Sequence, residues 1–245
     1  MEQWKPHDGP QEEFCRSDAF EVLYGGAAGG GKTETLILLP IRFIYHPRFR
    51  GVILRRTFPQ LREIIDRCWR YYPKLGGVYR STEHRWYFPS GATIELGHMQ
   101  HSDSMYNYQG REYHMICFDE LTQFTEEQYL YLFSRARSTI PELQPMIRST
   151  CNPGGVGHNF VFQRFVASAD PNKKVKDRHT GLSRMFIPAT LYDNPTLLES
   201  DPQYVKRLEA LPETEKKRLL FGDWDVFDGQ VFNISPETHG IDPFN

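Results

Sequence analysis

Several features are scarce in this sequence of 245 residues, and each absence excludes a class of protein. The four cysteines lie far apart and include no C-x-x-C pair, which argues against both a zinc site and a disulfide framework. They are Cys15, Cys68, Cys117 and Cys151. No apolar run approaches the roughly 18 to 20 residues that a membrane helix needs, and Met1 to Pro6 lacks the apolar core of a signal peptide. We therefore expect a protein of a reducing cytoplasm that does not enter membranes.

Net charge is also nearly absent, because 29 Lys and Arg residues face 31 Asp and Glu residues, which leaves −2. This balance argues against a generally basic coat for nucleic acid. The charge is uneven, however, since the stretch from Arg42 to Arg85 holds about eight positive charges in excess. That stretch is either a surface for a polyanion or a set of solvated helix and loop faces, and both interpretations remain open.

The residues that are present allow a full hydrophobic core. Hydrophobic residues make up 39% of the chain, and its length suits one large α/β domain or a domain with a short extension. We find no internal repeat and no low-complexity segment.

The most informative segment is a glycine-rich loop that fits the pattern G-x-x-x-x-G-K-[ST]. It consists of Gly26, Ala27, Ala28, Gly29, Gly30, Gly31, Lys32 and Thr33. In this pattern backbone N–H groups surround phosphate oxygens, the lysine reaches the β- and γ-phosphates, and the hydroxyl is a Mg²⁺ ligand. The context agrees, because Phe20 to Tyr24 predicts a buried strand and Thr33 to Leu39 predicts the start of a helix. The sequence therefore predicts a nucleotide site.

A second motif is an apolar run that ends in two carboxylates, from Met115 to Glu120. If this run is a buried parallel strand, its last residues emerge beside the phosphate loop at the carboxyl edge of the sheet. Asp119 is then placed to hold Mg²⁺, and Glu120 to orient and deprotonate a water molecule. Because a kinase needs an acceptor site and no water-activating glutamate, the pair favours hydrolysis of ATP to ADP and phosphate.

A third strand is expected from Met146 to Asn152, ending in small hydroxyl and amide residues. Thr150 and Asn152 are placed to respond to the presence of the γ-phosphate. The following Asn152 to Gly155 also fits ordinary turn chemistry, so the residues alone leave both interpretations open.

Taken together, these motifs closely resemble those of the large terminase subunits of tailed bacteriophages, over about Pro6 to Phe232. The resemblance rests on Gly25 to Thr33, Cys117 to Phe124, Thr150 to His158, Tyr192 to Pro195 and Phe221 to Asp225. Such proteins combine an N-terminal ATPase, which pumps double-stranded DNA into a procapsid, with a C-terminal metal-dependent nuclease. Since the chain stops at Asn245, we expect the ATPase part without the nuclease.

The resemblance also implies partners and a location. They are ATP and Mg²⁺ as cofactors, double-stranded DNA, the portal protein of the procapsid and the small terminase subunit. The domain is expected to work as a homo-oligomeric ring on the capsid and to be a monomer when isolated, in the host cytoplasm and without membrane contact.

By position, the resemblance gives Gln11 the role of reading adenine, since a carboxamide both donates to and accepts from the base edge. Thr150 and Asn152 fall on the motif that couples loss of the γ-phosphate to movement. One departure concerns an arginine that many terminases have before the glycine nine residues ahead of the metal-binding aspartate. Here that position is Gln109, and a glutamine cannot neutralise transition-state charge.

Either another residue supplies this positive charge, or the mechanism lacks it. We look for an arginine that could reach the site of a neighbouring subunit. Arg111 is adjacent to the departure. A capping box from Thr125 to Gln128 starts a helix that we expect to run on to Arg135 and Arg137. On a helix these two arginines point about 200° apart, so only one of them can face the neighbour. We favour Arg137, with a surface salt bridge as the alternative.

The sequence therefore predicts an α/β fold of the ASCE-type P-loop NTPase class, with a mainly parallel central sheet flanked by helices. We place the ATPase core at residues 1–187 and a small C-terminal lid or linker subdomain at 188–245. Arg85 to Phe88 and Thr93 to Leu96 are expected to form a hairpin on the sheet edge. Two other functions stay open, a helicase-like or recombinase-like DNA-dependent ATPase and a nucleotide-binding regulatory domain that does not hydrolyse.

Overall fold

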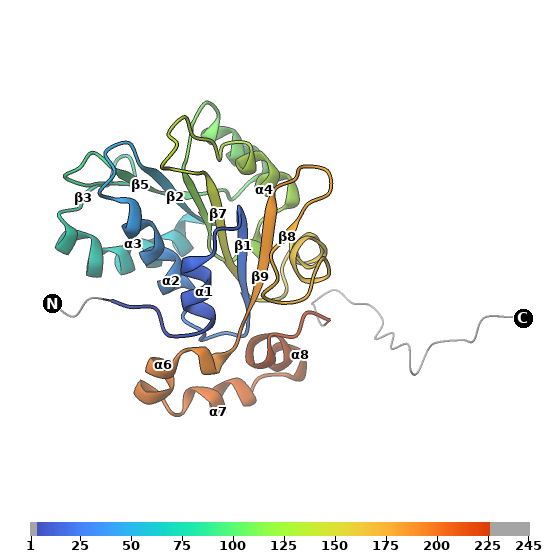
Figure 1. The fold of residues 1–245 in the computed structure, drawn as a ribbon. Coiled ribbons are helices and arrows are strands. Elements are labelled where there is room, and N and C mark those ends of the chain that lie inside the picture. Colours follow the sequence, from blue (N-terminus) through green and yellow to red (C-terminus); the bar gives the residue numbers. More distant parts are fainter. Residues whose placement is uncertain (1–3, 226–245) are drawn as a thin grey trace, which may run out of the picture.

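The computed structural model describes residues 4–225, which build a nine-stranded sheet with helices on both faces (Figure 1). The strand order is β3-β4-β5-β2-β6-β7-β1-β9-β8. The six central strands run parallel to one another. They are β1 (Glu21–Gly26), β2 (Arg50–Arg55), β5 (Thr93–His98), β6 (Met115–Phe118), β7 (Met146–Cys151) and β9 (Ser183–Ala189). The predicted mainly parallel α/β sheet is confirmed.

Antiparallel strands complete both edges of the sheet. On one edge β4 (Arg85–Tyr87) pairs with β5 and with β3 (Val78–Arg80), and on the other β8 (Val175–Lys176) pairs with β9. The predicted hairpin of residues 85–96 is present, with Trp86 opposite Ile94. Its second strand also pairs in parallel with β2, so the hairpin is continuous with the central sheet.

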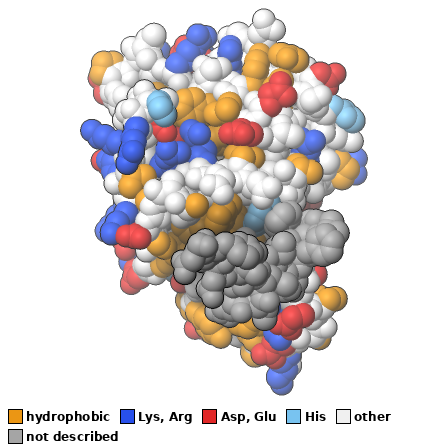
Figure 2. Space-filling view, turned by 90° about the vertical axis from the view of Figure 1, so that its right-hand side faces the viewer, with side chains coloured by type: hydrophobic (Ala, Val, Ile, Leu, Met, Phe, Trp, Pro, Cys, Tyr) orange, Lys and Arg blue, Asp and Glu red, His pale blue; other side chains and the backbone are white. Residues whose placement is uncertain are grey.

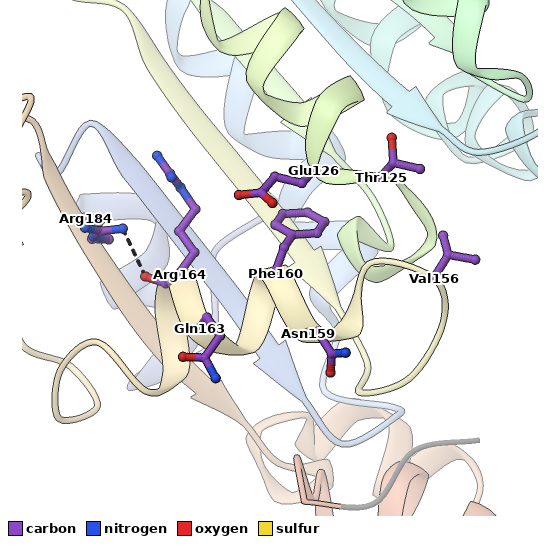
Figure 3. A pocket seen from close by; sticks show the side chains of 8 residues that line it. All are labelled: Thr125, Glu126, Val156, Asn159, Phe160, Gln163, Arg164 and Arg184. Atoms are coloured by element: carbon purple, nitrogen blue, oxygen red, sulfur yellow. Dashed lines mark hydrogen bonds between the residues drawn. The ribbon is translucent and has the colours of Figure 1, made fainter. Parts of the chain in front are cut away.

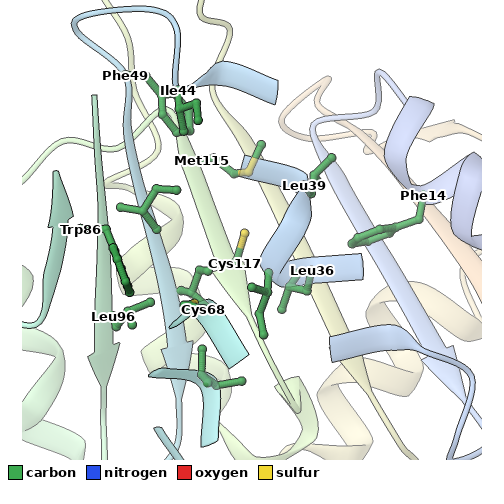
Figure 4. Close-up of a cluster of buried hydrophobic side chains, with 14 of the residues drawn as sticks. Phe14, Leu36, Leu39, Ile44, Phe49, Cys68, Trp86, Leu96, Met115 and Cys117 are labelled. Carbon is green, nitrogen blue, oxygen red and sulfur yellow. The ribbon is translucent and has the colours of Figure 1, made fainter. Parts of the chain in front are cut away.

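One face of the sheet is covered by α1 (Pro10–Arg16), α2 (Lys32–Leu38) with its extension η1 (Leu39–Phe43), and α3 (Phe58–Tyr71). Because side chains alternate along a strand, Met115 and Cys117 of β6 point to this face. There they join a core that includes Phe14, Leu36 and Trp86 (Figure 4). The short η2 (Tyr72–Leu75) continues α3 beside the edge strands.

The opposite face is covered by α4 (Glu126–Phe133), α5 (His158–Val161), η3 (Ser102–Tyr108), η4 (Leu121–Gln123) and the π-helical turn η5 (Phe162–Val166). The alternate residues of β6, Ile116 and Phe118, pack here with Tyr129 of α4. The sheet is therefore buried on both sides, and its functional groups emerge at its carboxyl edge.

The chain after β9 forms helices that lie together at the bottom of Figure 1. They are η6 (Leu191–Asp193), α6 (Pro195–Ser200), α7 (Tyr204–Glu209), α8 (Glu213–Lys216) and η7 (Lys217–Phe221). The boundary that we placed between residues 187 and 188 lies inside β9, which continues to Ala189. The role of these helices as a lid stays a prediction, and the last part of that subdomain lies outside the described residues.

The structure corrects the expected end of α4. The capping box is present, with Thr125 Oγ1 accepting from Gln128 N at 3.2 Å. The helix ends at Phe133, however, and does not reach the two arginines. Ala136 instead pairs with Tyr113 in an isolated parallel bridge, so the 200° argument for Arg135 and Arg137 does not apply. Within residues 4–225, no helix combines the length and the apolar character needed to cross a membrane.

Candidate nucleotide site

The phosphate loop connects the end of β1 to the start of α2, as predicted. Gly26 has φ of 142°, a region that favours glycine, and a Cβ there would collide with the backbone of Ala189. Gly31 caps α2 with φ of 73°. The turn therefore needs glycine at these two positions for backbone reasons.

Asn152 connects the lysine of the loop to the carboxylate of Glu120. Lys32 Nζ donates to Asn152 Oδ1 at 2.9 Å and also contacts the carbonyl of Ala27. The amide Nδ2 and the backbone N of Asn152 donate to the two oxygens of Glu120 at 3.0 and 3.1 Å. One side chain thus links the group expected to hold phosphate to the group expected to activate water.

Asp119 is buried at the centre of the site and collects three partners. Thr33 Oγ1 lies 3.0 and 3.2 Å from its oxygens, and Thr150 Oγ1 donates to Oδ1 at 2.5 Å. Arg55 Nε forms an ion pair with Oδ2 at 2.9 Å. The predicted Thr33, Asp119 and Thr150 are therefore in direct contact, although they come from three different elements.

Glu120 occupies an unusual backbone conformation, with φ of 59° and ψ of 58°. Left-handed geometry is unfavourable for a residue with a Cβ and recurs at functional sites. Desolvation raises the pKa of Glu120, and the negative charge of Asp119 adds to this effect, whereas Lys32 and Arg55 act in the opposite direction. Burial likewise lowers the pKa of Lys32, against the attraction of Glu120. The charges in this site therefore depend on each other.

Gln11 lies beside the phosphate loop, but its polar atoms already have partners. Its Nε2 lies 3.2 Å from Gly30 O and 3.3 Å from Asp193 O, and its Oε1 accepts from His7 N at 3.2 Å. In this arrangement Gln11 joins α1 to the loop and to the C-terminal helices. Its role in reading adenine stays a prediction.

The C-terminal helices hold the loop at several points that the sequence did not predict. Ala28 N donates to Leu219 O at 2.7 Å, and Asn194 Nδ2 donates to Gly29 O at 2.7 Å. Arg218 Nε donates to Pro153 O at 3.1 Å, behind Asn152. The motif containing Asn194 was part of the resemblance, but its contact with the loop depends on tertiary structure.

The three arginines expected to complete the site lie elsewhere in the subunit. Arg135 and Arg137 flank the bridge of Ala136 with Tyr113, which precedes β6, whereas Asp119 follows β6. They are therefore at the amino edge of the sheet, opposite the phosphate loop. Arg137 Nε is 3.4 Å from Glu112 Oε2, and the guanidinium of Arg135 stacks on Tyr131.

Arg111 is engaged at this same amino edge. Its guanidinium contacts the buried Glu95, which also accepts from Arg85 at 2.8 Å and from Tyr113 at 2.9 Å. These residues line a cleft of about 320 Å³. None of the three arginines contacts the nucleotide site of its own subunit, so any role there requires a neighbouring copy.

The residue that sequence reasoning missed is Arg55. It is the last residue of the apolar strand β2, Asp119 directly follows β6, and the two strands are neighbours. The argument from carboxyl ends of parallel strands that located Asp119 applies equally to Arg55. In the sequence it counts only as one charge of the basic stretch from Arg42 to Arg85.

A groove of about 550 Å³ lies beside α4 and α5 (Figure 3). Its lining consists of Thr125, Glu126, Val156, Asn159, Phe160, Gln163, Arg164 and Arg184. None of the predicted site residues lines it. The face that carries β8 presents both basic and acidic side chains, with hydrophobic side chains exposed between them (Figure 2).

In a comparison with known families, residues 23–239 match the model described as terminase large subunit, T4likevirus-type, N-terminal. No curated protein matches the chain.

Among solved structures, the large terminase of a thermophilic bacteriophage is similar with 16% identity and a TM-score of 0.69, over 90% of this chain and 54% of that one. Two other structures of the same phage protein are described as complexes with ADP and with ATP-γ-S. The large terminase ATPase domain of Thermus phage P74-26 matches with 17% identity and a TM-score of 0.60, over 90% and 94% of the two chains.

The large terminase of bacteriophage HK97 matches with 13% identity and a TM-score of 0.61, over 91% of this chain and 52% of that one. The chain thus spans about half the length of the HK97 protein and of the protein from the thermophilic bacteriophage. At these identities the similarity shows the fold, which is that of terminase ATPase domains.

Proposed function

We propose that this chain hydrolyses ATP to drive double-stranded DNA into a procapsid. The chain belongs to the T4-like-virus-type family of large terminase subunits, and it matches the model of the N-terminal part of those subunits. The observation that carries this proposal is the contact network of Lys32, Thr33, Asp119, Glu120 and Asn152 at one edge of the sheet. These residues supply a phosphate ligand, oxygen donors for a metal and a base.

The oxygen donors fit Mg²⁺, which prefers hard oxygen ligands and usually bridges protein carboxylates to substrate phosphates. Thr33 Oγ1 and the carboxylate of Asp119 lie within hydrogen-bond distance of each other, and Asp119 is held in place by Thr150. These two side chains would hold the ion. Bound Mg²⁺ would neutralise charge on the β- and γ-phosphates during transfer.

Glu120 acts as the base in this proposal. Its carboxylate is held by both nitrogen donors of Asn152, so its direction is fixed before ATP binds. A carboxylate with a raised pKa is a better acceptor of a proton from water than an ordinary glutamate. Lys32 and the amides of Gly29 to Thr33 bind the phosphates, while the C-terminal helices close over the loop.

DNA, the portal protein of the procapsid and the small terminase subunit are the proposed partners, and the working form is a homo-oligomeric ring in the host cytoplasm. Contacts with DNA should go to phosphates, because a packaging motor must accept any sequence. Such contacts weaken with salt as counterions compete. DNA-stimulated hydrolysis is therefore expected to fall as ionic strength rises.

The decisive test is Glu120→Gln. The variant should bind ATP with near-native affinity and lose about 10²- to 10⁴-fold in kcat, because the amide cannot accept a proton. Binding is measured by calorimetry and turnover by phosphate release. Glu142→Gln is the matched control, because Glu142 is exposed and lies in the segment between α4 and β7. This variant should keep native turnover.

The outcomes also separate the remaining alternatives. A regulatory nucleotide-binding domain would show no turnover in the native chain, and Glu120→Gln would change nothing. A helicase would hydrolyse ATP and separate a forked duplex, whereas a packaging motor would move on duplex DNA without unwinding it.

A further inference from the structure

Arg55 lies at the carboxyl edge of the sheet, beside the proposed metal-binding aspartate. Leu54 of β2 pairs with Phe118 of β6, and Asp119 N donates to Leu54 O at 2.9 Å. This register puts Arg55, the last residue of β2, next to Asp119, which follows β6. The position of Arg55 is therefore fixed by the central strands of the sheet and not by a loop.

The side chain of Arg55 is only 12% exposed, and within the described part of the chain its one ion pair is with Asp119. The Nε atom is 2.9 Å from Oδ2, the same oxygen that lies 3.2 Å from Thr33 Oγ1. Among residues 4–225, no hydrogen bond from the two terminal nitrogens of Arg55 is found. A largely buried guanidinium with two donor groups to spare is well suited to an anion that arrives later.

The phosphate loop carries little positive charge of its own, so a nearby guanidinium could add to phosphate binding. The loop from Gly26 to Thr33 contains no arginine, and Lys32 is its only cation. Arg111, Arg135 and Arg137 lie at the opposite edge of the sheet. Arg55 is close enough to the catalytic carboxylate for its positive charge to lower the pKa of Glu120.

We propose that Arg55 binds the γ-phosphate of ATP within its own subunit, through the two terminal nitrogens that its ion pair with Asp119 does not use. This inference rests on the proposed ATPase function and adds a catalytic residue to it. A guanidinium presents paired donors that match phosphate oxygens, so it can stabilise charge that builds up during transfer. The subunit then supplies one phosphate-binding arginine itself, whether or not a neighbour supplies another.

The competing interpretation is that Arg55 only neutralises Asp119 and keeps it oriented. The two differ in which ligand responds to loss of the guanidinium. A γ-phosphate contact affects ATP analogues and spares ADP, with or without metal. A neutralising ion pair affects metal-dependent binding of both nucleotides alike.

The experiment measures the dissociation constants of ATP-γ-S and ADP for the full chain, in Mg²⁺ and in EDTA, by calorimetry. Arg55→Ala should weaken ATP-γ-S by about 10- to 100-fold in both conditions, the range expected for a charge-assisted hydrogen bond. ADP binding should change by less than about 3-fold, as expected for a group that it does not contact. Arg55→Lys should recover only part of the loss, because an ammonium lacks the paired donors.

Arg56→Ala is the control, because this neighbouring guanidinium contacts Gln128 rather than the site and both affinities should stay native. Thermal unfolding monitors whether each variant folds. If Arg55→Ala does not fold, Arg55→Gln is used for the same comparison of the two nucleotides. Equal weakening of both nucleotides, or a defect seen only with Mg²⁺, overturns the proposal. A native chain that binds neither nucleotide overturns the ATPase function and this inference with it.

Discussion

At the scale of single residues, Asn152 links the lysine of the phosphate loop to the proposed base. Its side chain accepts from Lys32 and donates to Glu120, and its carbonyl accepts from Thr122 Oγ1 at 2.8 Å. An arriving phosphate would compete for Lys32, so Asn152 would lose one partner while keeping the other. This is a physical route by which the presence of the γ-phosphate can reach the loop after β7.

We predict that Asn152→Ala lowers kcat by about 10-fold, because Glu120 loses the hydrogen bond from Asn152 Nδ2 and keeps only the one from the backbone N. Affinity for ATP should change less, since Lys32 is then free for phosphate. Steady-state kinetics give kcat and KM separately. Asn159→Ala, at an exposed position on α5, should behave as the native chain. Native kcat in Asn152→Ala would refute the role of this bridge.

The sequence predicted most of these residues because two strong patterns coincide. A glycine loop locates Lys32 and Thr33, and polar residues after apolar runs locate Asp119 and Thr150. Arg55 was not recognised because the side chain of an arginine at the end of a strand is usually exposed to solvent. Only the pairing of β2 with β6 reveals that this arginine is directed toward a buried carboxylate.

At the scale of elements, the beginning and end of α4 show what local sequence can predict. The start was correct because the capping box makes specific hydrogen bonds between neighbouring residues. The end was wrong because no glycine or proline marks it. The chain leaves the helix after Phe133 so that Ala136 can pair with Tyr113, which is a tertiary contact.

The cap offers a measurement of element stability. Thr125→Ala should cost about 1 kcal/mol, because Gln128 N loses its side-chain acceptor at the helix start. For a domain of this size the loss corresponds to about 2–4 °C in Tm. Thermal denaturation of Thr125→Ser, which keeps the acceptor, and of the exposed Thr139→Ala should give values near the native one. An unchanged Tm in Thr125→Ala would mean that the cap contributes little.

At the scale of the whole molecule, the two edges of the sheet carry different chemistry. The carboxyl edge holds the phosphate loop, whereas the amino edge presents Arg111, Arg135 and Arg137. In a ring, one edge of a subunit can approach the other edge of its neighbour. The position of these arginines is compatible with action in trans and excludes contact with the site of their own subunit.

We predict that ATP hydrolysis per molecule rises with protein concentration and that Arg137→Ala abolishes the rise while leaving the basal rate. Arg135→Ala should have a smaller effect. Arg111→Ala is a poor probe, because Arg111 contacts the buried Glu95 and its loss should also lower Tm. Specific activity is measured across a dilution series for each variant. A flat series with no arginine effect would contradict hydrolysis in trans.

The global fold was the easier part to predict, because consecutive buried strands with helices between them admit few arrangements. The contacts between the C-terminal helices and the loop could not be predicted. Ala28 and Leu219 meet across nearly the whole described chain, and neither residue type carries any signal for the other.

That contact has a mechanical meaning. The hydrogen bond from Ala28 N to Leu219 O, together with the close fit of Gly222 against the loop, connects η7 directly to the phosphate loop. A pulling force on η7 would therefore be transmitted to the phosphate loop. If the domain works as a packaging motor, a force that opposes DNA movement would then change the affinity of the phosphate loop for ATP.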